Sequence, residues 1–262
     1  MERMLTLRTG EIACSVHGAG PPIVVLHRDV VAPGLSPYVE ALGEHHEVYS
    51  LDLPGFGRSP RPSWMRNVTQ LATLTGHAIA ALELPACPLI GLGFGGWVAA
   101  DLATQGFSHL VSELVLVSPW GVKPSAGEIA DFVLFDLGRW ASMGFYDPEN
   151  YTAACGDPLE YELMRAWDNA RECVTAVAWK PIGHSRALRA MLPLLAMPTL
   201  LAWGAEDAIV PASCIHDWAE AIPEASTLVL ANAGHQVDRE EPRALAAATL
   251  DFVRSHQLQE AR

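Results

Sequence analysis

Apolar runs and helical periodicities alternate through the N-terminal part of the chain. Three short apolar runs, over 23–26, 89–90 and 114–117, predict strands buried on both faces of a sheet, and a further strand is expected over 48–51. Apolar residues at helical spacing predict three helices, over 37–42, 71–82 and 95–105. Residues 4–16 alternate around Thr9-Gly10 and predict a hairpin. Strands alternating with helices through short connections indicate an α/β fold with a mostly parallel sheet.

The pattern changes after residue 128. Residues 129–195 are helical in character and rich in large aromatic side chains, with no clear strand. The alternation then resumes, with strands expected over 199–203 and 227–230 and helices over 212–221 and 242–256. We therefore expect a core domain made of 1–128 and 196–262, with 129–195 inserted between two sheet strands as a helical lid.

Composition and charge narrow the class of partner. Of 262 residues, 50% are hydrophobic and 18% charged, which is enough apolar material for a buried core. The 17 basic and 30 acidic residues give a formal net charge of -13. Nucleic acid and anionic membranes both attract a basic surface, so this balance argues against either and favours a small-molecule partner. The sequence leaves a monomer and a homodimer both possible.

The five cysteines are odd in number and widely spaced, and none forms a C-x-x-C pair. This spacing indicates neither a disulfide framework nor a zinc site, and we expect no metal and no cofactor. The N-terminus shows no apolar signal segment, and no apolar run approaches the ~20 residues of a membrane helix. Together with the free thiols, these features predict a cytoplasmic protein.

The stretch from Leu89 to Trp97 combines an apolar strand, a glycine-rich turn and the start of a helix. This is the form of a nucleophile elbow, G-x-S-x-G, which presents a catalytic side chain above a sheet. Here the nucleophile position is Gly93, which has no side chain. The turn also matches the dinucleotide fingerprint G-x-G-x-x-G. However, the next predicted strand ends in Ser118-Pro119 without an acid for a ribose, so we do not expect such a cofactor.

Ligands of open parallel sheets bind at the carboxyl ends of the strands. The residues expected there are His27-Arg28-Asp29, Gly93-Phe94, Trp120, Glu206-Asp207 and Gly234-His235. An acid followed by a histidine, both after the elbow, is the chain order of an α/β-hydrolase triad.

Over nearly its whole length the chain resembles proteins of the α/β-hydrolase fold. The resemblance rests on segments that occur in order at suitable separations, namely 24–27, 52–59, the elbow, 203–207 and 233–235. It implies about eight mostly parallel strands and a helical lid. It also implies that Asp207 and His235 are the acid and base of the site.

Two departures from that family affect the acyl-transfer machinery. Gly93 replaces the usual serine, and Arg28 replaces the glycine that usually follows the first histidine. The oxyanion hole would use the backbone N–H of Phe94 and one near Arg28 or Asp29. An Asp29 carboxylate beside a developing oxyanion would oppose its charge. Arg28 could be a solvated charge, an anchor for an anionic substrate, or a partner of Asp29.

We hypothesise that His235, oriented by Asp207, transfers protons directly on a small, largely apolar carbonyl-type substrate or on water. Gly93 would leave room for a water or substrate atom in place of a serine oxygen. Trp120, beside the elbow, could line the pocket or merely pack. Two alternatives remain: a catalytically inactive protein that keeps a ligand pocket, and an esterase-like serine hydrolase in which Gly93 is an engineered change.

Overall fold

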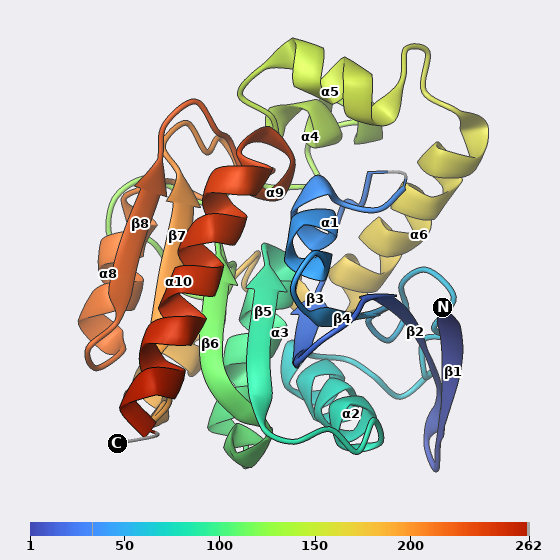
Figure 1. Cartoon of the computed structure of the whole chain (residues 1–262). Coiled ribbons are helices and arrows are strands. Elements are labelled where there is room, and N and C mark those ends of the chain that lie inside the picture. Colours follow the sequence, from blue (N-terminus) through green and yellow to red (C-terminus); the bar gives the residue numbers. More distant parts are fainter. Residues whose placement is uncertain (33, 261–262) are drawn as a thin grey trace.

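An eight-stranded sheet forms the centre of the molecule (Figure 1). The computed structural model of the chain describes residues 1–32 and 34–260. The strand order is β1-β2-β4-β3-β5-β6-β7-β8, and β2 runs antiparallel to its neighbours β1 and β4 while the remaining pairs are parallel. The strands are β1 (Glu2–Leu7), β2 (Gly10–Gly18), β3 (Pro22–Leu26), β4 (Glu47–Leu51), β5 (Cys87–Leu92), β6 (Val111–Val117), β7 (Thr199–Gly204) and β8 (Ser226–Leu230). The predicted α/β architecture with a mostly parallel sheet is confirmed.

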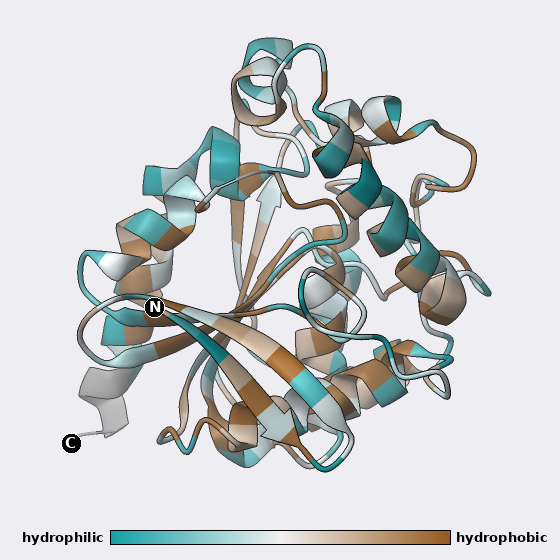
Figure 2. Ribbon diagram, turned by 90° about the vertical axis from the view of Figure 1, so that its right-hand side faces the viewer, coloured by the Kyte–Doolittle hydropathy of each residue, from teal (hydrophilic) through white to brown (hydrophobic). Residues whose placement is uncertain are grey.

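Helices cover both faces of this sheet and bury its apolar side chains. On one face, α1 (Pro37–Gly43) and α10 (Pro242–Glu260) pack on alternate residues of the central strands. On the other face lie α2 (Val68–Ala80), α3 (Phe94–Thr104) and α8 (Cys214–Ala221). Figure 2 shows the apolar colouring concentrated on the central strands, as expected for a sheet buried on both faces.

The segment between β6 and β7 lies above the carboxyl ends of the strands (Figure 1). Its described residues form helices and irregular connections without a strand. The helices are α4 (Leu137–Met143), α5 (Pro148–Cys155), α6 (Tyr161–Ala178), α7 (Leu188–Met191) and the 3₁₀ turn η2 (Leu192–Leu194). The division into a core and a lid stays a prediction.

Two short elements were not anticipated from the sequence, and one of them bears on the site. They are the 3₁₀ turn η1 (Ser108–Leu110) and the helix α9 (Val237–Glu240), which directly follows His235. Within the described part of the chain, no helix has both the length and the apolar character needed to cross a membrane.

Candidate active site

The turn between β5 and α3 has the backbone geometry of an elbow. Gly93 has φ 52° and ψ −116°, a conformation that is costly for residues with a side chain. Two residues later, a Cβ on Gly95 would lie 2.4 Å from the carbonyl oxygen of His27. Glycine at position 95 therefore allows the first turn of α3 to approach the end of β3, which places the loop after His27 beside Gly93.

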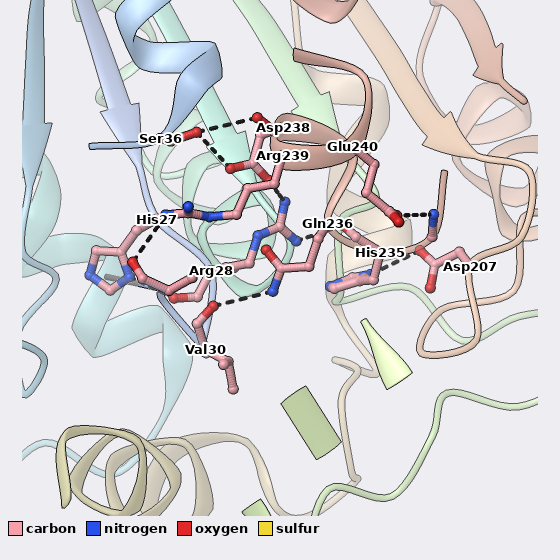
Figure 3. Close-up of polar contacts among 12 residues, drawn as sticks. His27, Arg28, Val30, Ser36, Asp207, His235, Gln236, Asp238, Arg239 and Glu240 are labelled. Carbon is pink, nitrogen blue, oxygen red and sulfur yellow. Dashed lines mark hydrogen bonds and ion pairs between the residues drawn. The ribbon is translucent and has the colours of Figure 1, made fainter. Parts of the chain in front are cut away.

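Asp207 and His235 form a hydrogen-bonded pair next to this turn (Figure 3). His235 Nδ1 lies 2.8 Å from Asp207 Oδ2, and both side chains are almost completely buried. The other carboxylate oxygen, Oδ1, accepts hydrogen bonds from the backbone N–H groups of Ile209 and Val210 at 2.8 and 2.9 Å. The carboxylate is therefore fixed, and it favours the tautomer of His235 that carries a proton on Nδ1.

The second imidazole nitrogen of His235 faces Trp120 and Gly93. Trp120 Nε1 donates to His235 Nε2 over 3.4 Å. A Cβ on Gly93 would lie 2.9 Å from the same nitrogen, 3.1 Å from Arg28 Cβ and 3.3 Å from Arg28 Nη1. The imidazole and the arginine side chain therefore border the space in which a serine oxygen was expected to be replaced by water or a substrate atom, and that expectation stays a prediction.

Arg28 is buried, with 3% of its surface exposed, and it pairs with Asp238 rather than Asp29. Its Nη2 donates to Asp238 Oδ1, and its Nη1 donates to the backbone oxygen of His235 over 2.7 Å. Asp238 Oδ2 accepts a further bond from Ser36 Oγ at 2.9 Å. Burial alone would raise the pKa of Asp238, but the charge of Arg28, helped by Arg239 and Ser36, lowers it. Both partners therefore stay charged.

Asp29 is directed toward the inserted helices. Its Oδ2 accepts a hydrogen bond from Trp140 Nε1 at 2.9 Å. Phe94, whose backbone N–H was expected in the oxyanion hole, packs its ring edge-on against Trp120 with centroids 6.1 Å apart. The Arg28 side chain, rather than the Asp29 carboxylate, is thus the charged group adjacent to Gly93.

His27 has a structural environment in which both ring nitrogens have partners. Nδ1 lies 2.6 Å from the carbonyl oxygen of Arg28, and Nε2 accepts from the backbone N–H of Leu53 at 3.0 Å. These contacts require a neutral ring protonated on Nδ1. Burial lowers the pKa of His27, although the bond to Arg28 opposes this effect. His27 therefore holds the loop in place and offers no nitrogen to a substrate.

Sequence reasoning missed two carboxylates of α9 that organise the site. Asp238 neutralises Arg28, and Glu240 accepts the backbone N–H groups of Gly234 and Tyr146 at 2.7 and 2.9 Å. Glu240 also accepts the N–H of Asp147 at 2.9 Å. The available signal was the run Asp238-Arg239-Glu240, which begins three residues after the predicted base, since charged side chains need partners when they are buried.

A cavity of about 300 Å³ lies beside the Arg28–Asp238 ion pair, and both residues line it. It is lined by His27, Arg28 and Asp29 on one side and by Trp167 of α6 on another, but not by His235 or Gly93. Among the described residues, no group of three or more His, Cys, Asp or Glu side chains is placed to hold a metal ion. All five cysteines are buried and unpaired with one another.

Comparison with known proteins identifies a matching protein family and several relatives of similar sequence. The model of the Alpha/beta hydrolase family matches residues 16–248. A pimeloyl-[acyl-carrier protein] methyl ester esterase of Aeromonas hydrophila is 29% identical over 237 residues, covering 83% of this chain and 89% of that protein. The dihydrolipoyllysine-residue acetyltransferase component of the acetoin cleaving system of Pseudomonas putida is 28% identical over 224 residues. The match covers 82% of this chain, but only 58% of that longer protein.

Solved structures with the same fold include a bacterial membrane phospholipase A, with a TM-score of 0.77 and 23% identity. That match covers 98% of this chain and 86% of the other. A serine hydrolase involved in carbazole degradation has a TM-score of 0.75 and 20% identity, and covers 96% and 98% of the two chains. At these identities the likeness establishes the fold.

Proposed function

Because the chain belongs to the alpha/beta hydrolase family, whose matched relatives here include methyl ester esterases, we propose that it is an enzyme without a covalent nucleophile. His235 and Asp207 would act by acid/base chemistry on a small, largely apolar carbonyl-type substrate. The proposal covers hydrolysis through water and proton transfer of the lyase or isomerase kind.

The observation that supports this proposal is the fully hydrogen-bonded Asp207–His235 pair at an elbow that carries no side chain. In hydrolysis, Nε2 would take a proton from water while the hydroxide attacks the carbonyl carbon. Asp207 would stabilise the resulting imidazolium. The imidazolium would then return the proton to the leaving oxygen, which restores neutral His235 and releases an acid and an alcohol.

The burial of His235 sets a requirement on this chemistry. Because His235 is fully buried and Trp120 Nε1 donates to its Nε2, a substrate can reach that nitrogen only if a neighbouring side chain moves. The position of Arg28 argues against an esterase that has merely lost its serine, since a serine at position 93 would meet both His235 and Arg28.

The alternative function is a ligand-binding protein without catalytic activity. It is favoured by one observation, namely that the 300 Å³ cavity is not lined by His235, which is itself 0% exposed. Such a protein would bind a molecule in the cavity and release it unchanged.

The deciding experiment compares wild type with His235→Ala and Asp207→Asn on a panel of small esters, lactones and ketones. We expect His235→Ala to lower kcat/KM for the best substrate by roughly 10²–10⁴-fold, the usual contribution of a general base. His109→Ala, at an exposed histidine in η1, is the matched control and should leave activity unchanged. Turnover that survives in His235→Ala would refute the proposal, and binding without turnover in wild type would favour the alternative.

A further inference from the structure

The 300 Å³ cavity borders the face of the sheet that α1 covers. Ser15 of β2, Ser50 of β4 and Val25 of β3 are register partners in neighbouring strands, and all three line the cavity. Register partners direct their side chains to the same face of a sheet, so these residues form one row along the cavity. Val39 of α1 also lines it and belongs to the same apolar cluster as Val25. One end of the row therefore presents hydroxyl groups and the other end apolar side chains.

The two serine hydroxyls are free to bind a ligand. Within residues 1–32 and 34–260, no group forms a hydrogen bond with Oγ of Ser15 or of Ser50, and both serines are only half-buried. By contrast, Ser36, which also lines the cavity, donates its hydroxyl hydrogen to Asp238 (Figure 3). Residues directly opposite in an antiparallel pair have Cβ atoms about 4.5–5.5 Å apart. The hydroxyls of Ser15 and Ser50 can therefore contact two oxygens of one small molecule.

Asp52 adds a hydrogen-bond acceptor at the same end of the cavity. It lies two residues after Ser50 and lines the cavity as well. Its Oδ2 accepts from the backbone N–H and the Nε–H of Arg58 at 3.0 and 3.2 Å, whereas Oδ1 accepts no hydrogen bond from any described residue. The Asp52 side chain is 25% exposed, and Oδ1 is open to solvent. A ligand in the cavity can therefore reach this oxygen.

The charges around the cavity favour an uncharged ligand. Arg58 offsets the charge of Asp52, and it also pairs with Glu2, whose side chain is 75% exposed and screened by solvent. Elsewhere in the lining, Arg28 is paired with Asp238. The two remaining charged side chains of the lining have opposite signs, and they are Arg239 and Asp29. An ammonium or a carboxylate would therefore meet no excess of opposite charge to offset the cost of leaving water.

We propose that this cavity binds a small neutral diol, whose two hydroxyl groups contact Ser15, Ser50 and Asp52. Its carbon frame packs on Val25 and Val39. A hydroxyl group both donates and accepts hydrogen bonds, so it suits the serines, which can do either, and the carboxylate, which only accepts. Neither the candidate base nor the vacant elbow position lines the cavity. The inference therefore goes beyond the proposed function and does not depend on it.

The test titrates the protein with cis-1,3-cyclohexanediol, which carries two hydroxyl groups on an apolar ring. We expect saturable binding that shifts the backbone amide signals of Ser15 and Ser50 in a ¹H–¹⁵N NMR spectrum. Ser15→Ala and Ser50→Ala should each weaken binding by roughly 2–10-fold, the effect of one lost hydrogen bond. Ser63→Ala, at an exposed serine that does not line the cavity, is the matched control and should leave binding unchanged.

Thermal unfolding separates a binding role of the hydroxyls from a structural one. Because neither hydroxyl has a hydrogen-bond partner in the described part of the chain, replacing either serine by alanine should leave the melting temperature unchanged. A lower melting temperature of Ser15→Ala or Ser50→Ala, together with unchanged diol binding, would show that the hydroxyls stabilise the fold. That result would overturn the proposal.

Three compounds with the same ring test the class of ligand. Binding of cyclohexanol as tight as that of the diol would overturn the need for a second hydroxyl group. Tighter binding of cis-3-aminocyclohexanol or of cis-3-hydroxycyclohexanecarboxylate would overturn the neutral class, and absence of any diol binding would refute the site. All these titrations measure binding and not turnover. Their failure therefore leaves the role of His235 untouched, and turnover that does not depend on His235 leaves this inference standing.

Discussion

Gly93 has neighbours that would have to shift by a few tenths of an ångström to admit the side chain that the fold normally carries there. A Cβ would come within 2.9 Å of His235 Nε2, and that ring is held by Asp207 and Trp120. We predict that Gly93→Ser alone produces no esterase activity and lowers the melting temperature. Hydrolysis of p-nitrophenyl butyrate and thermal unfolding measure the two effects. Strong hydrolysis by the single variant would contradict this account of the site.

Removing the Arg28 side chain from beside position 93 should allow a serine at that position to support ester hydrolysis. In Gly93→Ser/Arg28→Gly/Asp238→Asn, the arginine that contacts position 93 is absent, and its buried carboxylate partner is neutralised so that no unpaired charge remains. We predict measurable ester hydrolysis by this triple variant. The variant with Arg28→Gly and Asp238→Asn but without the serine is the control, and it should hydrolyse the ester more slowly than the triple variant.

His27 gives a prediction about pH. Its folded pKa lies below the ordinary value because burial disfavours the charged ring. The unfolded chain therefore binds a proton, at a pKa of about 6.5, before the folded protein does. The contribution of neutral His27 to stability is complete above that pH and is lost progressively as the pH falls below it.

The His27→Gln variant isolates this contribution. Denaturant titrations between about pH 7 and pH 5 should show that wild type loses stability with a steeper slope than the variant. The difference should be at most about 1.4 kcal/mol per pH unit, the limit for one proton. Identical slopes would mean that His27 is not held neutral. Comparing slopes cancels the contribution of His46, whose pKa is also lowered by burial.

At the residue scale, the order of residues along the chain predicted that Asp207 and His235 meet, but it did not predict which carboxylate pairs with Arg28. The order of Asp207 and His235 after the elbow was sufficient to bring them together, because parallel strands end at one edge. The partner of Arg28 lies 210 residues away on α9, a helix of four residues with too little periodicity to be predicted. Asp29 is the carboxylate next to Arg28 in the sequence, but it accepts a hydrogen bond from Trp140 of the inserted segment instead.

At the element scale, α9 links the loop of His235 to the inserted segment. Glu240 accepts N–H groups from Gly234 on one side and from Tyr146 and Asp147 on the other. Gln236 N–H also donates to the Gly144 oxygen over 2.7 Å. The turn between α4 and α5 is therefore tied to the residues that flank the candidate base.

We predict that Glu240→Ala loosens both sides of this connection. Amide hydrogen exchange of Gly234, Tyr146 and Asp147 should become faster, because each loses its acceptor. Exchange in the central strands β5 and β6 should not change. Glu241→Ala, which removes the adjacent carboxylate, is the control. Faster exchange on only one side would show that Glu240 does not connect the two.

The strands were the best predicted elements, for a physical reason. A strand buried on both faces is apolar over most of its length, so apolar runs within β3, β5, β6 and β7 stand out in the sequence. Helix ends were displaced by a few residues. For instance, α10 continues to Glu260 rather than ending at 256, because the residues after 256 include no glycine or proline to mark a helix end.

At the scale of the whole molecule, the inserted segment does not have a hydrophobic core of its own. Phe132 and Trp140 pack on Trp120, with ring centroids 5.8 and 6.0 Å away, and all three belong to the larger apolar cluster of the protein. Trp167 of α6 donates its Nε1–H to the oxygen of Val31, in the loop after β3, over 2.9 Å. The segment is therefore attached to the sheet through both apolar contacts and hydrogen bonds.

This shared core predicts that the protein unfolds in one cooperative transition. Far-UV circular dichroism, which follows the helices and strands, and tryptophan fluorescence, to which three of the eight tryptophans contribute from the inserted segment, should give the same midpoint. Trp140→Phe keeps an aromatic ring but leaves the buried Asp29 Oδ2 without its donor. The loss of about 1–3 kcal/mol should lower the midpoint by roughly 2–10 °C for both probes together. If the fluorescence midpoint alone fell, the segment would be an independent unit, and the interface between Trp120, Phe132 and Trp140 would not couple it to the sheet.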